Sequence, residues 1–311
     1  MLPSFNDMIE ARKNDKRMDD VRKLVEWDGS TSTIKLIGNT FINHHQFENI
    51  SKTKFENRIS LCETMQNPAS IQKLFENVCD KSKHTCSKRQ LAIHMTQAFS
   101  RRSPVCFFKP SIAKHFYKKF NATKVLDPTA GWGGRMLGAY ACGIEYIGID
   151  TNIDLKPAYV SMIEELKYPA KMIWDSCLNV DFSELDYDFV LTSPPYFNKE
   201  IYENMKPFEN KKTFYIDFLI PMIEKCIKYN KGQWVCININ PEYYNELICY
   251  FRPADRIEEY QQSTAKKEGK PKMEFIYCWS KTDCATCEKC NEKDNEIKKL
   301  KEKLRLIGLL L

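Results

Sequence analysis

Residues 192–196, Thr-Ser-Pro-Pro-Tyr, form a rigid polar corner directly after an apolar run. Proline fixes φ near about −65° and has no backbone N–H, so Ser193 and the carbonyl of Pro194 offer acceptors in a loop with few donors. Such acceptors favour an amine, because two acceptors on its hydrogens orient the nitrogen lone pair toward an electrophile. Tyr196, directly after Pro195, can stack on a planar ring. A proline-rich turn without chemistry is the alternative.

A glycine-rich stretch, "DPTAGWGGRMLGA", begins at Asp127 after a second apolar run. Glycines at Gly131 and Gly133 permit positive φ and close approach of the backbone to a ligand. The residues that follow are typical of a helix, whose amino terminus offers unpaired N–H groups. A tight turn between a strand and a helix, without a ligand, is the other interpretation.

Two further aspartates, Asp150 and Asp175, close the runs "YIGID" and "KMIWD". An acidic side chain after the second strand of a nucleotide-binding fold can accept hydrogen bonds from both ribose hydroxyls. Asp175 is then placed to meet an adenine amino group. Either aspartate alone is more typical of a helix cap, but their order after Asp127 indicates a bound nucleoside.

The glycine-rich stretch, the two aspartates and the proline corner can act together only if the fold brings them to one edge of a sheet. Short β-rich runs alternate with helical segments, which predicts an α/β fold with a mostly parallel sheet and crossover helices. The predicted strands cover 124–127, 146–150, 171–175, 188–192 and 233–239, and 256–260 with 274–280 forms a terminal hairpin around the loop "AKKEGKPK". Ligands collect at the carboxyl ends of such strands. Helices are expected over 8–27, 70–78 and 87–98.

Composition sets wider bounds. The 311 residues, 43% of them hydrophobic, can bury a full core, and 47 Lys and Arg against 41 Asp and Glu give a net charge of +6. No secretion signal opens the chain, and "LRLIGLLL" is far short of the ~20 apolar residues of a membrane span. Thirteen cysteines read as reduced thiols. We expect an intracellular protein, cytoplasmic or nuclear, with no membrane partner.

The paired motifs resemble class I S-adenosylmethionine-dependent methyltransferases, specifically DNA amino-methyltransferases with a Ser-Pro-Pro-Tyr type motif. The resemblance covers residues 107–280 and implies a Rossmann-like fold with a seven-stranded sheet and S-adenosylmethionine as cofactor. It implies a catalytic loop of Ser193, Pro194, Pro195 and Tyr196. It implies cofactor contacts from Lys109, Pro110, Asp127, Pro128, Gly131, Gly133, Asp150 and Asp175. Within that set, the glycine loop lies at the methionine part, Asp150 at the ribose and Asp175 at the adenine.

The resemblance also implies a substrate, the exocyclic amine of a DNA base. Serine at the first motif position favours cytosine N4 over adenine N6. A paired base cannot reach such a pocket, so base flipping or a single strand is required. The alternatives are methylation of RNA or of a protein amide by the same fold, and a catalytically idle nucleic-acid-binding scaffold. Backbone phosphates would meet basic clusters at 88–89, 101–102, 211–212 and 266–272.

Three regions divide the chain: an N-terminal region over 1–105, a methyltransferase domain over 106–281 and a tail over 282–311. Target recognition falls to the first region or to the loop 198–213. In the tail, Cys284, Cys287 and Cys290 are weak zinc candidates, because one compact cluster lacks the second pair of a closed tetrahedral site. The spacing of apolar residues after these cysteines predicts a short helix. This helix docks on its own domain, frays, or associates weakly with a second copy of the chain.

Overall fold

The computed structural model describes residues 4, 7, 17–31, 36–52, 60–79, 92, 107–195, 197, 208–267 and 270–281. Tyr196, the predicted helix over 87–98 apart from residue 92, and the whole tail with its three cysteines lie outside the described residues. Among the residues described, no helix is both long and apolar enough to cross a membrane.

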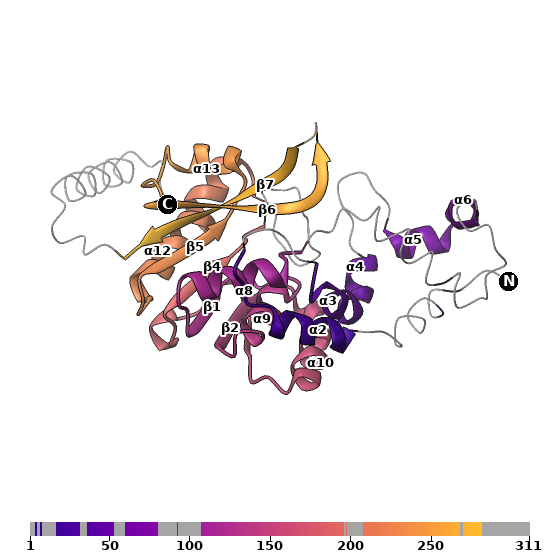
Figure 1. The fold of residues 1–311 in the computed structure, drawn as a ribbon. Helices are drawn as coiled ribbons and strands as arrows, with labels where there is room; N and C mark the ends of the chain where they lie inside the picture. The colour runs from indigo at the N-terminus through magenta and orange to yellow at the C-terminus, as the bar shows by residue number, and fades with distance from the viewer. Residues whose placement is uncertain are drawn as a thin grey trace.

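One seven-stranded sheet organises the chain, in the order β3-β2-β1-β4-β5-β7-β6 (Figure 1). The strands are β1 (Lys124–Asp127), β2 (Glu145–Asp150), β3 (Lys171–Trp174), β4 (Phe189–Thr192), β5 (Trp234–Asn238), β6 (Arg256–Lys267) and β7 (Lys270–Ser280). β1 to β5 run parallel, and β7 pairs antiparallel with both β5 and β6. The predicted Rossmann-like α/β fold, with its terminal antiparallel hairpin, is confirmed.

The terminal hairpin is longer than the sequence predicted. The stretch "AKKEGKPK" was expected to be a loop, but β6 continues to Lys267 and β7 begins at Lys270. Backbone pairing continues there, with register shifts between Gln261 and Ser263 and between Ser263 and Lys266. The sequence does not predict this extension, because residues 261–272 are mostly polar and lack the alternation of apolar and polar residues that is typical of a strand.

Helices cover both faces of the sheet, and the side chains of the strands alternate between them. Val125 and Phe189 belong to one buried cluster, whereas their neighbours Leu126 and Val190 belong to the other. The first face carries α8 (Pro110–Lys119), α9 (Gly134–Tyr140) and α10 (Lys156–Leu166); the second carries the π-helix η3 (Phe214–Leu219), α12 (Ile220–Tyr229) and α13 (Pro241–Leu247). This alternation is the period of two expected for buried strands.

Three N-terminal helices pack on the first face, α2 (Arg17–Glu26), α3 (Asn39–His45) and α4 (Phe47–Lys52). They are followed in the chain by α5 (Leu61–Gln66) and α6 (Pro68–Cys79). Figure 1 shows α2 and α3, in indigo, beside α8, α9 and α10. Leu24, Phe41 and Ile42 are fully buried in the same hydrophobic cluster as α8 and α9. This part of the predicted 1–105 region therefore contributes to the core that supports the sheet.

A buried lysine fastens α2 to α8. Lys114 is 2% exposed, and its Nζ donates hydrogen bonds of 2.8 Å to the carbonyls of Leu24 and Val25 at the carboxyl end of α2. Unpaired carbonyls at a helix end need donors, and a cation there also suits the helix dipole. At the other end of α2, Arg17 pairs with Glu165 of α10 at 3.0 Å.

We expect Lys114→Met to loosen the N-terminal helices, because the two carbonyls would lose their donor inside the core. The free energy of unfolding should fall by about 1–3 kcal/mol, and limited proteolysis should cut the N-terminal segment faster. Lys118→Met, at an exposed position of the same helix, is the matched control. If the two variants have the same free energy of unfolding and the same rate of cleavage, Lys114 does not hold α2.

Candidate functional site

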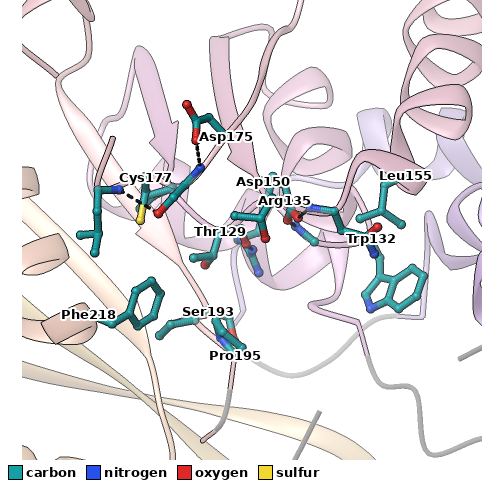
Figure 2. A pocket seen from close by; sticks show the side chains of 18 of the residues that line it. Thr129, Trp132, Arg135, Asp150, Leu155, Asp175, Cys177, Ser193, Pro195 and Phe218 are labelled. Carbon is teal, nitrogen blue, oxygen red and sulfur yellow. Dashed lines mark hydrogen bonds between the residues drawn. The ribbon is translucent and has the colours of Figure 1, made fainter. Parts of the chain in front are cut away.

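A cavity of about 620 Å³ opens at the carboxyl ends of the parallel strands. It is lined by the segments that follow four of them, 128–132 after β1, 150–152 at β2, 175–179 after β3 and 193–195 after β4. Figure 2 shows Trp132 and Phe218 at opposite ends, with Ser193 and Pro195 along one side and Asp150 among the residues that line it. The predicted motifs therefore meet at one cavity.

The glycine loop after β1 bends through two left-handed residues. Gly131 has φ +58° and Gly133 has φ +90°. A Cβ at Gly133 would lie 2.9 Å from Cε of Met162, whereas a Cβ at Gly131 would meet nothing closer than 3.9 Å. Gly131 lines the cavity and Gly133 does not. Gly133 therefore allows close packing on α10, while Gly131 supplies the turn and leaves its pocket side open.

Asp150 is held by two backbone donors. Its Oδ2 accepts from the N–H of Gly131 at 2.7 Å and its Oδ1 from the N–H of Asn152 at 2.8 Å. Burial raises the pKa of the Asp150 carboxyl above its ordinary value, and these two hydrogen bonds act in the opposite direction. The carboxylate joins the end of β2 to the glycine loop and lines the cavity.

Asp127 lies beneath the cavity wall, although the resemblance placed it among the cofactor contacts. Its side chain has no exposed surface and accepts hydrogen bonds from Nε of Arg135 at 2.7 Å, the hydroxyl of Tyr146 at 2.7 Å and that of Thr192 at 2.8 Å. Both carboxylate oxygens are therefore occupied by protein donors. Thr192 also shares a 2.6 Å hydrogen bond with Thr129, which lines the cavity. The Asp127 carboxylate thus supports the wall.

Asp175 lines the cavity but already bonds the turn that follows β3. Its Oδ1 accepts from the N–H of Ser176 at 2.6 Å and from Nδ2 of Asn179 at 2.9 Å, and Figure 2 shows its side chain at the upper rim. No helix begins directly after Asp175 in the structure, so these contacts hold the turn over 177–179 and are not a helix cap. They coexist with a position on the cavity wall.

Of the other predicted site residues, some line the cavity and some lie beside it. Pro128, Ser193, Pro194 and Pro195 line it, whereas Lys109 and Pro110 do not. The Nζ of Lys109 stands 4.5 Å from the ring centre of Phe107, a lining residue. Pro110 is buried as the first residue of α8, because proline suits the first turn of a helix.

Several lining residues were missed. They are aromatic or acidic side chains that the sequence analysis does not single out: Phe107, Phe108, Trp132, Phe208, Asp217 and Phe218. The "FF" before α8 and the tryptophan inside "GWGG" were visible signals. Asp217 and Phe218 lie in the π-helix, whose wide turn is a recurrent feature of functional sites, but no local pattern predicts it.

The charge of the lining is negative. Its charged side chains are Asp150, Asp175, Asp217 and Arg135, and Arg135 is paired with Asp127. Among the described residues that line the cavity there are therefore three carboxylates, and the one cation, Arg135, is already paired. Such a site repels phosphate groups and attracts a cationic ligand. Among the described residues, no group of three or more His, Cys, Asp or Glu side chains could hold a metal ion.

Comparisons with known proteins found no matching family model and no matching curated protein. Solved structures with a similar fold are methyltransferases. TrmN from Thermus thermophilus is 11% identical with a TM-score of 0.42, covering 65% of this chain and 70% of its own. An RNA methyltransferase from Salinibacter ruber with S-adenosylhomocysteine is 18% identical with a TM-score of 0.35, covering 58% and 95%.

A third structure is the tRNA (uracil-54, C5)-methyltransferase of Pyrococcus abyssi with S-adenosylhomocysteine. It is 14% identical with a TM-score of 0.38, and the match covers 57% of this chain and only 39% of that one. These three comparisons describe a limited likeness in fold alone. Two of the structures contain S-adenosylhomocysteine.

We expect Asp127→Ala to destabilise the protein strongly, because Arg135 would remain buried without its partner. The free energy of unfolding should fall by about 3–5 kcal/mol, measured by chemical denaturation at neutral pH. The double variant Asp127→Leu with Arg135→Leu should recover part of this loss, since it buries no charge.

The exposed pair of Glu48 and Lys52, 2.7 Å apart, provides the control, and Glu48→Ala should cost much less. If Asp127→Ala costs no more than Glu48→Ala, the network under the cavity is not a structural constraint.

Proposed function

We propose that the protein transfers a methyl group from S-adenosylmethionine to an exocyclic amine of a nucleic-acid base. One observation carries this proposal. The Ser193-Pro194-Pro195 corner lines the same cavity as the glycine loop and Asp150, so a nucleoside-binding wall and a donor-poor corner face one space.

The cavity suits this cofactor better than a phosphate-bearing one. When bound, S-adenosylmethionine supplies an electrophilic methyl carbon on a positively charged sulfonium. The three lining carboxylates attract that charge, whereas they would repel the pyrophosphate of a dinucleotide. Asp150, at the end of β2, is placed to accept hydrogen bonds from ribose hydroxyls. Apolar surface at Cys177 and Leu178 can hold a planar purine beside Asp175.

The corner would act on the amine. An exocyclic amine is a weak nucleophile because its lone pair is delocalised into the ring. Acceptors at Ser193 and at the Pro194 carbonyl would bind its two hydrogens and orient the lone pair toward the methyl carbon. Serine is a poor base, so the neutral amine would attack and lose its proton to water afterwards. Tyr196 stays the predicted stacking partner of the base.

The nucleic acid can be DNA or RNA. The sequence resemblance favoured DNA and cytosine N4, with RNA among the alternatives, while two of the structures of similar fold are described as methyltransferases of RNA or tRNA. The amines of cytosine and adenine occur in both polymers. The proposal therefore rests on the amine, and the polymer is an outcome of the experiment.

Tritium transfer tests the proposal directly. The full chain is incubated with methyl-labelled S-adenosylmethionine and with duplex DNA, single-stranded DNA, RNA or protein in separate reactions. We expect label in a nucleic acid, and we expect Ser193→Ala to reduce turnover by about 10²-fold while cofactor binding persists. Label in protein alone would contradict the proposal. Absence of label together with absence of cofactor binding by calorimetry would favour the scaffold alternative.

We also expect acid-sensitive binding of the cofactor. The charged form of Asp150 accepts the ribose hydroxyls, and burial raises the pKa of that carboxyl in the free protein. Affinity should therefore fall as the pH drops through this raised pKa, above the ordinary ~3.9. Asp150→Asn should bind more weakly at neutral pH and lose this dependence. Exposed Glu184→Gln is the control, and calorimetry with S-adenosylhomocysteine is the measurement. An identical pH profile for Asp150→Asn and the native protein would remove Asp150 from the site.

A further inference from the structure

Ser193 makes a hydrogen bond away from the cavity. Its Oγ lies 3.3 Å from Oδ1 of Asn238, the last residue of β5. Asn238 is 4% exposed and is not among the residues lining the cavity. It therefore lies behind the corner, where it contacts the serine without facing a ligand.

The direction of this hydrogen bond follows from the other partner of Asn238. The side-chain amide nitrogen of Asn238 donates to the backbone carbonyl of Phe275, on β7, at 2.9 Å. A carbonyl can only accept, so the amide must turn its nitrogen toward Phe275 and its oxygen toward Ser193. An amide oxygen can only accept, so the serine hydroxyl must donate.

A hydroxyl has a single hydrogen, and here it is directed at Asn238. The lone pairs of Ser193 Oγ remain available as acceptors, on a residue that lines the cavity. Pro194 and Pro195 have no backbone N–H. The corner can therefore accept hydrogen bonds from a ligand, while its serine cannot donate one without breaking the contact with Asn238.

We propose that Asn238 is a positioning residue that makes the Ser193 corner selective for an amine over a carbonyl. A base with an exocyclic amine, cytosine or adenine, donates into the corner. A base with a carbonyl at the same position, uracil or hypoxanthine, would place its carbonyl oxygen beside the acceptors of the corner, where no hydrogen bond can form. This deepens the proposed function and rests on it only for the identity of the ligand as a base.

Asn238 offers two informative substitutions. Asn238→Asp keeps an oxygen toward Ser193, and its second oxygen, when protonated, donates to the Phe275 carbonyl in place of the amide. The Ser193 hydroxyl then still donates to residue 238, and the corner keeps its polarity. Asn238→Leu has similar size but no acceptor, so the hydroxyl is free to rotate and to donate to a carbonyl ligand. Ser193→Ala removes the hydroxyl itself. Thermal melting and the affinity for S-adenosylhomocysteine serve as controls, because Asn238 does not line the cofactor wall.

Binding of cytidine and uridine is measured by ligand-observed NMR with saturating S-adenosylhomocysteine, and adenosine with inosine is a second pair. The pyrimidines are the primary readout, since they lack the purine of the cofactor. We expect the native protein and Asn238→Asp to bind cytidine at least ~10-fold more tightly than uridine, because a mismatched buried polar group is strongly rejected. Asn238→Leu and Ser193→Ala should bring the ratio toward one.

Equal binding of both pyrimidines by the native protein, no binding of either up to millimolar concentration, or an unchanged ratio in Asn238→Leu would overturn the assignment. The result is separable from the proposed function. An amine preference without methyl transfer to any polymer would leave this assignment standing and reject the enzyme. Methyl transfer without an amine preference would support the enzyme and reject the role assigned to Asn238.

Discussion

The buried carboxylate of Asp127 is the interaction on which the site depends. It receives donors from Arg135 on α9, Tyr146 on β2 and Thr192 on β4, so one side chain joins three neighbouring elements to the end of β1. A carboxylate without exposure is tolerated only when its oxygens are fully bonded. Burial, reinforced by the Asp127 charge, holds the pKa of Tyr146 well above its ordinary value, which keeps this phenol a donor. The start of the glycine loop and the start of the proline corner are thereby fixed relative to each other.

This network also determines the electrostatics of the cavity. Because Arg135 is paired with Asp127, the other charged side chains among the described lining residues are carboxylates. The glycine loop supplies backbone donors, and one of them is already bound by Asp150. At the opposite wall, Ser193 directs its only hydrogen to Asn238. The lining carboxylates favour a ligand that carries positive charge at one end. The acceptors at the Ser193 corner favour a ligand whose other end donates hydrogen bonds.

Much of the fold could be predicted from local sequence. Buried parallel strands read as short apolar runs bounded by charge or glycine, so the predicted 124–127 coincides with β1 and the others fall within one or two residues of β2 to β5. Because ligands collect at the carboxyl ends of such strands, the sequence also predicted that Asp150, Asp175 and Ser193 line one cavity, as they do. The outer part of the hairpin of β6 and β7 could not be predicted, because its sequence over 261–272 lacks alternating apolar residues.

The remaining features depend on contacts between distant residues. Asn238 lies 45 residues from Ser193, and nothing in the sequence near either one links them. The occupation of Asp127 by Arg135 needs the crossing of β1 and α9, and the lining by Phe218 needs a π-helical turn. The packing of α2 and α3 on the sheet likewise arises from a shared core. Tertiary packing decides such contacts, and local propensity does not report them.

We propose that the Ser193 corner directs methyl transfer to an exocyclic nitrogen. Mass spectrometry of nucleosides tests this most directly, after DNA and RNA have been incubated with the protein and S-adenosylmethionine and digested completely. We expect a new methyl group on the amino nitrogen of cytosine or adenine. A methyl group found instead on a ring carbon or on a ribose oxygen would contradict it.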